Sequence, residues 1–212
     1  MLLALALFAN QLESVEGGGF KLQLGAVTAK LREAEEAEAS GDQAGAERLR
    51  REAQLLFAAT ESIASEYEAV REHNPYGQAR TQAMEELVAQ ARKMAEFDFV
   101  SADAIEQLFR SGQDGNRITA IGLMRAKPEL AKLPLLTEVI RRSRSSFEQW
   151  HALRVCLELV RRGTSAAQQE EIRAAIAAAG ANGTLRGGLD GSRVRLAAMI
   201  ESELRESGST SG

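Results

Sequence analysis

The fold is decided by one long stretch, AERLRREAQLLFAATESIASEYEAV, which covers residues 46–70. Its small and apolar side chains advance by alternate steps of three and four residues, seven steps in a row. Only an α-helix places such positions on one face, and a mean step of about 3.5 residues is typical of a coiled-coil seam. The seam consists of Ala46, Leu49, Ala53, Leu56, Thr60, Ile63, Tyr67 and Val70. The stretch predicts a long helix, from about Gln43 to Glu72, that packs along other helices.

A further helix is predicted on each side of this long one. Residues 24–39 show the same spacing, and Ser40-Gly41-Asp42 ends it with a glycine suited to a helix end and an aspartate suited to the next N-cap. After the turn signal Asn74-Pro75-Tyr76-Gly77, the spacing resumes and continues to Met94. The sequence therefore predicts an antiparallel coiled-coil domain of three helices over residues 24–96.

The second half of the chain indicates shorter helices separated by turn signals. Bulky apolar residues follow serines that suit N-caps, namely Ser101, Ser145 or Ser146, Ser165 and Ser192. Only 3 prolines and 5% aromatic residues occur in the 212-residue chain, which favours helices over a sandwich. We predict an all-α protein, with a helical domain over residues 97–205 and a disordered tail over 206–212.

Within this helical domain, three segments share one layout. Residues 117–124 (RITAIGLM) align with 149–156 (QWHALRVC) at a shift of 32, and 193–200 (RVRLAAMI) follow the same pattern around a central alanine. The segments resemble HEAT-like or armadillo-like helical repeats, in which a central alanine lets neighbouring helices pack closely. The resemblance implies a helical solenoid over roughly residues 101–205, and an irregular helical bundle is the alternative.

The N-terminal segment, residues 1–23, is predicted to be an apolar stretch and a Gly-rich linker. The apolar residues Leu2 to Ala9 are too few to cross a bilayer, which takes about 20. Three interpretations stay open: the end of a longer membrane helix, a short helix docked on the protein, or an interfacial anchor. After Gly17-Gly18-Gly19, the alternation of Phe20, Leu22 and Leu24 resembles a short strand.

The charge is distributed unevenly along the chain. The net charge is −4, with 10 basic against 16 acidic residues in 1–96 and 16 against 14 in 97–212. Neither half is basic enough for its composition alone to indicate nucleic-acid binding. Of the 16 basic residues in the second half, 14 are arginine, a residue that favours planar contacts with carboxylate or phosphate.

The residues that could carry catalysis do not form a convincing constellation. Glu148 and His151 have the Glu-x-x-His spacing of di-iron bundles, but the sequence holds no second pair. Cys156 is the only cysteine and lies in an apolar stretch, so we interpret it as a small core residue of a protein from a reducing compartment. No nucleophile elbow or phosphate-binding loop is found. We therefore predict no catalytic residue, no metal and no cofactor.

Candidate binding residues are arginines near helix ends: Arg141, Arg142, Arg144, Arg161 and Arg162. Three interpretations stay open for them. Cations in a last helical turn complement the helix dipole, which accounts for Arg141, Arg142, Arg161 and Arg162. The same cations could instead hold an acidic partner or nucleic acid.

The sequence thus predicts a non-catalytic scaffold or adaptor that binds another protein through helical-repeat surfaces. It predicts a cytoplasmic location and leaves open the inner face of a membrane, membrane association through Leu2 to Ala9, and self-association through the coiled coil. One alternative is a HEAT-like module that binds nucleic acid through an arginine ridge, although exposed aromatic residues for stacking are missing. Another is a helper domain of a larger enzyme or effector system.

Overall fold

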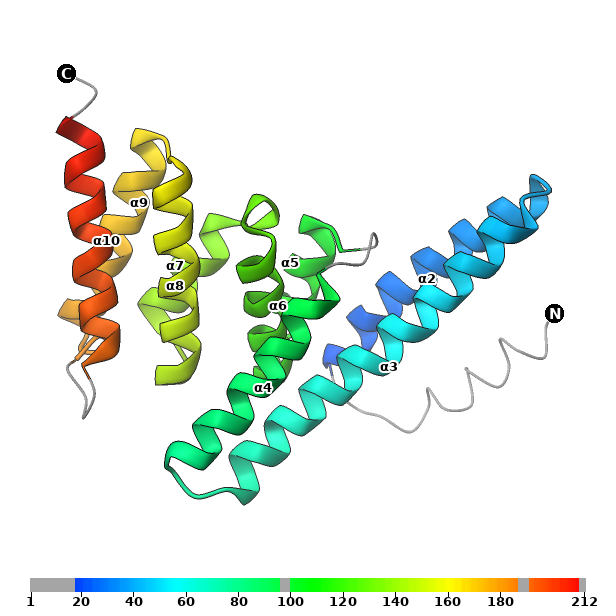
Figure 1. The fold of residues 1–212 in the computed structure, drawn as a ribbon, viewed down its shortest axis with the longest axis horizontal. Helices are drawn as coiled ribbons and strands as arrows, with labels where there is room; N and C mark the ends of the chain where they lie inside the picture. Colours follow the sequence, from blue (N-terminus) through cyan, green and yellow to red (C-terminus); the bar gives the residue numbers. More distant parts are fainter. Residues whose placement is uncertain (1–17, 96–99, 187–190, 210–212) are drawn as a thin grey trace.

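The chain folds into packed helices. The computed structural model describes residues 18–95, 100–186 and 191–209, and gives side chains for all of these except 18–28, 54–62 and 208–209. All regular structure within these ranges is helical (Figure 1). The elements are α2 (Gly18–Ala39), α3 (Gln43–His73), α4 (Gln78–Met94), α5 (Ala102–Arg110), α6 (Asp114–Ala126), the 3-10 turn η1 (Pro128–Leu130), α7 (Leu133–Arg142), α8 (Ser146–Arg162), α9 (Ala166–Ala181) and α10 (Ser192–Ser209).

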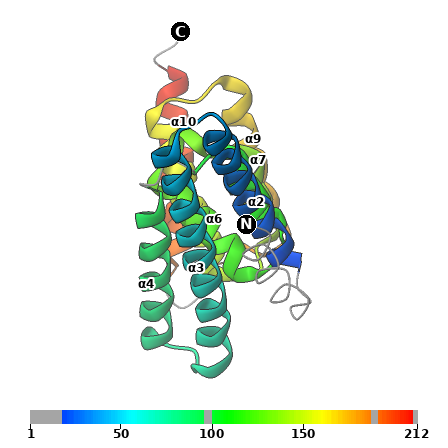
Figure 2. The same cartoon turned by 90° about the vertical axis from the view of Figure 1, so that its right-hand side faces the viewer.

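Helices that precede and follow the long helix α3 in the sequence both pack along it. Helix α2 lies along its first half and α4 folds back along its second half (Figures 1 and 2). Between α2 and α3, Gly41 takes a φ of 86°, and the backbone N–H of Gly45 donates to Asp42 Oδ1 at 2.9 Å. The predicted helix end and N-cap are confirmed at this turn, since glycine adopts positive φ without strain and the carboxylate satisfies a free helix N–H.

Helix α6 lies at the centre of the molecule and contacts α3, α4, α5 and α8. Every residue from 115 to 124 is buried. Small residues allow this crowding: a Cβ on Gly115 would lie 2.5 Å from the backbone oxygen of Ala64, and one on Gly122 would lie 3.0 Å from Ala91 Cβ. The backbones of α3 and α4 therefore approach α6 more closely than larger side chains would permit.

The helices after α3 form two rows. Helices α4, α6, α8 and α10 contact one another in that order, while α5 packs on α6, α7 on α8, and α9 on α7 and α10. One buried hydrophobic cluster runs from Ile63 and Tyr67 in α3 to Ile200 and Leu204 in α10. Residues before and after the expected domain boundary at 96/97 both belong to this core. Independent folding of residues 24–96 remains a prediction.

The structure corrects the expected ends of the helical region. Helix α2 begins at Gly18, so residues 18–23 are helical and form neither a linker nor a strand. An isolated strand would leave its backbone groups unpaired, whereas a helix satisfies them internally. At the other end, α10 continues to Ser209, into the region expected to be disordered. The apolar segment Leu2 to Ala9 lies outside the described residues. None of the described helices is long and apolar enough to cross a membrane.

Serine caps fix the starts of α5, α8 and α9. The hydroxyl oxygens of Ser101, Ser145 and Ser165 accept from the backbone N–H groups of Ala104, Glu148 and Gln168, respectively. Of the two serines considered for α8, Ser145 is therefore the N-cap. Local sequence chemistry sets these boundaries because each hydroxyl satisfies one N–H that the helix leaves free.

Candidate binding surface

The five arginines expected to bind a partner do not gather in one place. Arg141 and Arg142 end α7, and Arg144 follows them, whereas Arg161 and Arg162 end α8. Arg161 lies fifteen positions after Ser146 in α8, a distance of about 22 Å at 1.5 Å per residue. The two groups therefore belong to opposite ends of α8.

Three of these arginines are engaged within the chain. Arg144 lies 2.9 Å from Asp114, and Arg161 lies 2.7 Å from Glu203. Arg162 pairs with Glu158 at 2.9 Å and with Glu129 at 3.6 Å. Arg141 and Arg142 have no ion pair with any described residue. A role in partner binding stays a prediction for all five.

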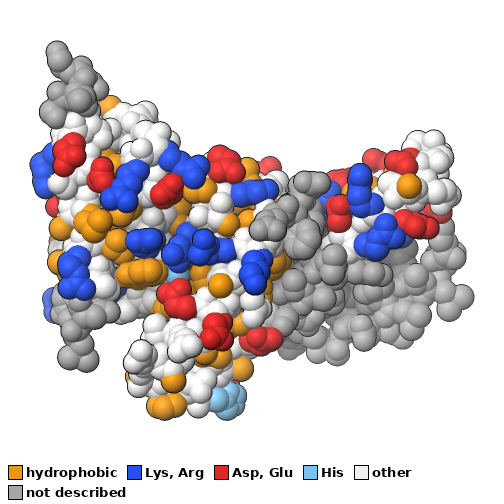
Figure 3. All heavy atoms as spheres, in the orientation of Figure 1, with side chains coloured by type: hydrophobic (Ala, Val, Ile, Leu, Met, Phe, Trp, Pro, Cys, Tyr) orange, Lys and Arg blue, Asp and Glu red, His pale blue; other side chains and the backbone are white. Residues whose placement is uncertain are grey.

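A different group of cations lies on the row formed by α4, α6 and α8. Arg92 comes from α4, Arg125 from α6 and Arg154 from α8, and we call these three with Trp150 the arginine–tryptophan cluster. The guanidinium carbons of Arg125 and Arg154 each lie 5.6 Å from the centre of the Trp150 ring. Figure 3 shows Lys and Arg side chains in a band across the middle of this face. Cations at this distance are attracted to the face of an indole ring.

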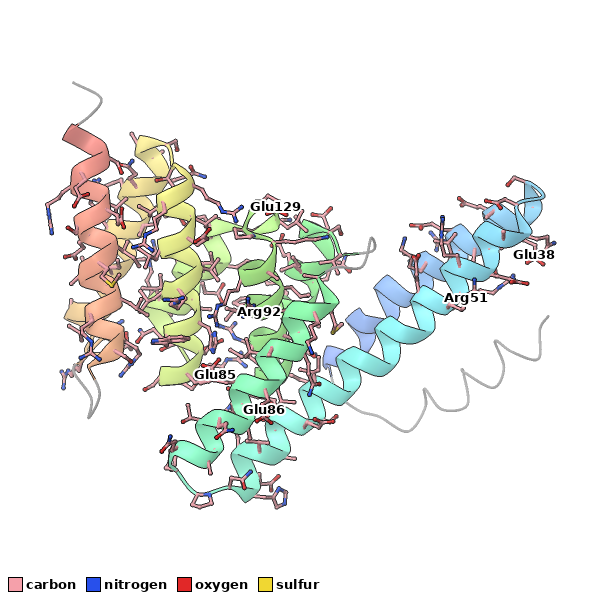
Figure 4. The ribbon with its side chains drawn as sticks, in the orientation of Figure 1. Glu38, Arg51, Glu85, Glu86, Arg92 and Glu129 are labelled. Atoms are coloured by element: carbon pink, nitrogen blue, oxygen red, sulfur yellow. The ribbon has the colours of Figure 1, made fainter. Side chains whose placement is uncertain are left out.

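The cluster carries more positive than negative charge. None of its three guanidinium groups forms an ion pair within the described part of the chain. Burial, and then the neighbouring Arg92 and Arg154, lowers the pKa of Arg125, and Glu85 opposes this shift. Glu85 and Arg92 both extend from α4 on the side that faces α8 (Figure 4). The cluster thus has three neighbouring cations, two of which repel Arg125, and one nearby carboxylate, that of Glu85.

His151 lies beneath the cluster and is fully buried. Its Nδ1 lies 3.2 Å from Nη1 of Arg125, and its Nε2 lies 3.3 Å from Oε1 of Glu85. Because a guanidinium can only donate, Nδ1 accepts and the ring proton of the neutral imidazole belongs on Nε2, facing Glu85. The alignment with Glu85 is too poor for a hydrogen bond, although the distance suits an ion pair with a protonated imidazole.

The protonation of this buried pair follows from its surroundings. Burial lowers the pKa of His151, and Arg125 and Arg154 add to that effect while Glu85 opposes it. Contact with His151 lowers the pKa of Glu85, with help from Arg125 and Arg92. At neutral pH the imidazole is therefore neutral and the Glu85 carboxylate is ionised.

The Glu-x-x-His pair of α8 is divided between two networks. Glu148 is buried and accepts from Nε of Arg117 at 2.7 Å and from the backbone N–H of Arg144 at 2.8 Å. Arg117 is also buried, with its guanidinium 4.0 Å from the centre of the Phe109 ring. These contacts fix the start of α8 against α6, and so position Trp150 and Arg154 one and two turns further along the helix.

Two observations concern metal-ligating and nucleophilic side chains among the described residues. No group of three or more metal-ligating side chains is found among the described residues. Burial raises the pKa of the Cys156 thiol to about 12, so the reactive thiolate is scarce at neutral pH. The arginine–tryptophan cluster instead offers several donors and a partly exposed ring to an anionic ligand.

Sequence reasoning missed this cluster because its members come from three helices. Trp150 and Arg154 are one turn apart, which is a visible local signal. Arg92 and Arg125 join them only through the relative positions of α4, α6 and α8, which no local spacing reveals. The sequence prediction favoured runs of neighbouring arginines, whereas Arg92, Arg125 and Arg154 each stand apart from other arginines in the sequence.

Comparisons with known proteins give no match: the chain matches no protein-family model, no curated protein and no solved structure.

Proposed function

We propose that this chain is a non-catalytic scaffold whose helices α4, α6 and α8 present a binding surface for another protein. The observation that carries the proposal is the arginine–tryptophan cluster, in which Arg125 of α6 and Arg154 of α8 lie against the Trp150 ring and Arg92 of α4 lies near enough to repel Arg125. Arginine and tryptophan are enriched among the residues that dominate binding energy at protein interfaces.

The architecture in this proposal is a HEAT-like head joined to a helical arm. The row of α4, α6, α8 and α10, with α5, α7 and α9 packed behind it, supports helical pairs that stack as repeats. Stacked pairs make an extended surface that suits a partner chain. The α2–α3 hairpin extends away from the head (Figure 1) and forms the arm.

The proposal includes a reducing location such as the cytoplasm, because the one cysteine is a buried thiol. Self-association through α3 and attachment to a membrane through Leu2 to Ala9 remain parts of the proposal that need their own tests.

Site-specific photo-crosslinking in the native cells tests the scaffold proposal. A photoreactive amino acid at Ala89 lies on exposed α4 surface three residues before Arg92. A matched probe at Ala174 lies on exposed surface of α9, in the other row. We expect one defined protein to crosslink at Ala89 and not at Ala174, and to form a complex of fixed stoichiometry when purified. Equal labelling at both sites, or none at either, would contradict the proposal.

A nucleic-acid module is the second candidate, because arginines beside a tryptophan also suit stacked bases and phosphates. It predicts binding of duplex DNA or heparin with a steep salt dependence. Indifference of the purified chain to both polyanions would exclude it.

A further inference from the structure

We infer that the arginine–tryptophan cluster recognises a short acidic peptide segment, with carboxylates at its arginines and an apolar side chain against Trp150. The inference rests on the proposed function and adds the chemistry of the partner. Planar guanidinium groups can donate two parallel hydrogen bonds to one carboxylate.

The surplus charge of the cluster is open to a ligand. Arg92 and Arg154 are exposed, and Arg125 is half-buried beside the partly exposed ring of Trp150. Glu85 lies next to His151 and is the carboxylate that lowers the repulsion on Arg125. An incoming carboxylate would relieve the remaining repulsion among the three cations.

The size of the cluster sets the length of the segment. Neighbouring helix axes lie about 8–10 Å apart, so three adjacent helices span roughly 16–20 Å between the outer axes. An extended peptide covers that distance with about six residues at 3.3 Å each. A short segment with acidic residues near both ends and an apolar residue between them therefore matches the surface.

The charge of the rest of the chain favours a short acidic peptide over nucleic acid. The net charge is −4, and residues 1–96, which include α4, hold 16 acidic against 10 basic residues. A long polyanion would meet repulsion beyond the cluster, and tight phosphate-backbone binding takes many cationic contacts. A segment confined to the cluster avoids that repulsion.

The only tryptophan of the chain reports directly on this site. The experiment titrates the full chain at low salt with a short peptide of Glu and Leu residues, and follows Trp150 fluorescence. The comparison ligands are the same peptide with every Glu replaced by Gln, and a single-stranded oligonucleotide of equal charge. We expect a saturable change with the Glu peptide, and at least about tenfold weaker binding of the Gln peptide, which corresponds to about 1.4 kcal/mol.

Two exposed arginines supply the variants. We expect Arg154→Gln and Arg92→Gln each to weaken binding of the Glu peptide several-fold, with an unchanged thermal unfolding midpoint. The matched control Arg205→Gln removes an exposed arginine of α10 and should leave the affinity unchanged.

Several results would overturn the inference. These are no saturable signal with the Glu peptide, equal binding of the Gln peptide, equal loss in the Arg205→Gln control, or tighter binding of the oligonucleotide. If a protein still crosslinks at Ala89 while the peptide fails, the inference fails and the scaffold proposal stands. If the peptide binds while no protein crosslinks, the scaffold proposal fails and the site stands.

Discussion

At the residue scale, buried polar groups restrict the fold more than the surface ion pairs do. Arg117 and Glu148 are both almost fully buried and 2.7 Å apart, whereas Arg161 and Glu203 are partly exposed at the same distance. Burial removes the solvation of both charges, so each buried partner depends on the other.

Replacing Glu148 by glutamine should therefore destabilise the protein strongly. Glu148→Gln leaves the buried Arg117 with only Glu138, 3.2 Å away, and we expect the free energy of unfolding to fall by about 3 kcal/mol. The control Glu203→Gln breaks the exposed pair and should cost less than about 1 kcal/mol. Denaturant unfolding measures the free energy of unfolding of both variants. Equal decreases would contradict the claim that the buried Arg117–Glu148 pair stabilises the fold more than an exposed pair does.

The His151–Glu85 pair should make stability depend on pH. The pKa of His151 is lowered from 6.5 in the folded chain, so the unfolded chain binds more protons just below that pH. The free energy of unfolding should therefore decrease as the pH falls below about 6.5. The pKa of Glu85 is also lowered, from 4.5, which adds a further loss as the pH falls below that value.

Unfolding midpoints measured across this pH range check the prediction. His151→Gln should flatten the dependence near pH 6.5, whereas the same change at the exposed His73 should preserve it. A steep dependence that survives in His151→Gln would assign the effect to other groups.

Residue-scale features were predictable where the signal is local. The caps Asp42, Ser101 and Ser165 follow from short sequence patterns, and the burial of Cys156 follows from its apolar neighbours. The contact between His151 and Glu85 joins α8 to α4 across 66 positions of sequence. No local pattern encodes such a contact.

At the element scale, close approach to α6 depends on glycine. Gly115 faces the backbone of Ala64 in α3, and a Cβ there would lie within 2.6 Å of the Cα and the carbonyl oxygen of Ala64. Main-chain atoms cannot move aside as a flexible side chain can, so the two helices would have to separate.

Gly115→Ala should consequently lower the free energy of unfolding by about 1–3 kcal/mol. Gly180 offers a matched control, because it is also helical and a Cβ there meets nothing within 4 Å. Gly180→Ala should be neutral or stabilise by up to about 1 kcal/mol. A neutral Gly115→Ala, measured by denaturant unfolding, would contradict the close packing of α3 on α6.

The long helices were predictable because their apolar spacing repeats many times, and the expected range Gln43–Glu72 differs from α3 by one residue. The start of α2 was not predictable from the sequence. Three consecutive glycines usually end a helix, whereas residues 18 and 19 are helical here. The glycine cost is about 1 kcal/mol per residue, which is small enough for the context of a long helix to outweigh.

At the scale of the whole molecule, helices α3 and α4 share one core with the later helices. Ile63 and Tyr67 of α3 and Met84 and Leu87 of α4 belong to the same buried cluster as the α6 and α8 side chains. The sequence predicted a boundary at 96/97 because the helices become shorter there, and it gave no sign that α6 packs against both α3 and α4.

A shared core predicts one cooperative unfolding transition. Trp150 fluorescence reports on the head, and circular dichroism reports on all helices. We expect the two thermal transitions to coincide, since exposing α6 removes cover from both parts. Separate transitions would instead support an independent coiled-coil domain over residues 24–96.

Charge reversal on the full chain tests most directly whether α4, α6 and α8 form one anion-binding surface. The variant Arg92→Glu/Arg154→Glu changes two exposed side chains from different helices and is titrated with the Glu peptide and with its Lys counterpart, again through Trp150 fluorescence. We predict that the wild-type chain prefers the Glu peptide and that the variant prefers the Lys peptide. The same preference in both chains would contradict a binding surface at the arginine–tryptophan cluster.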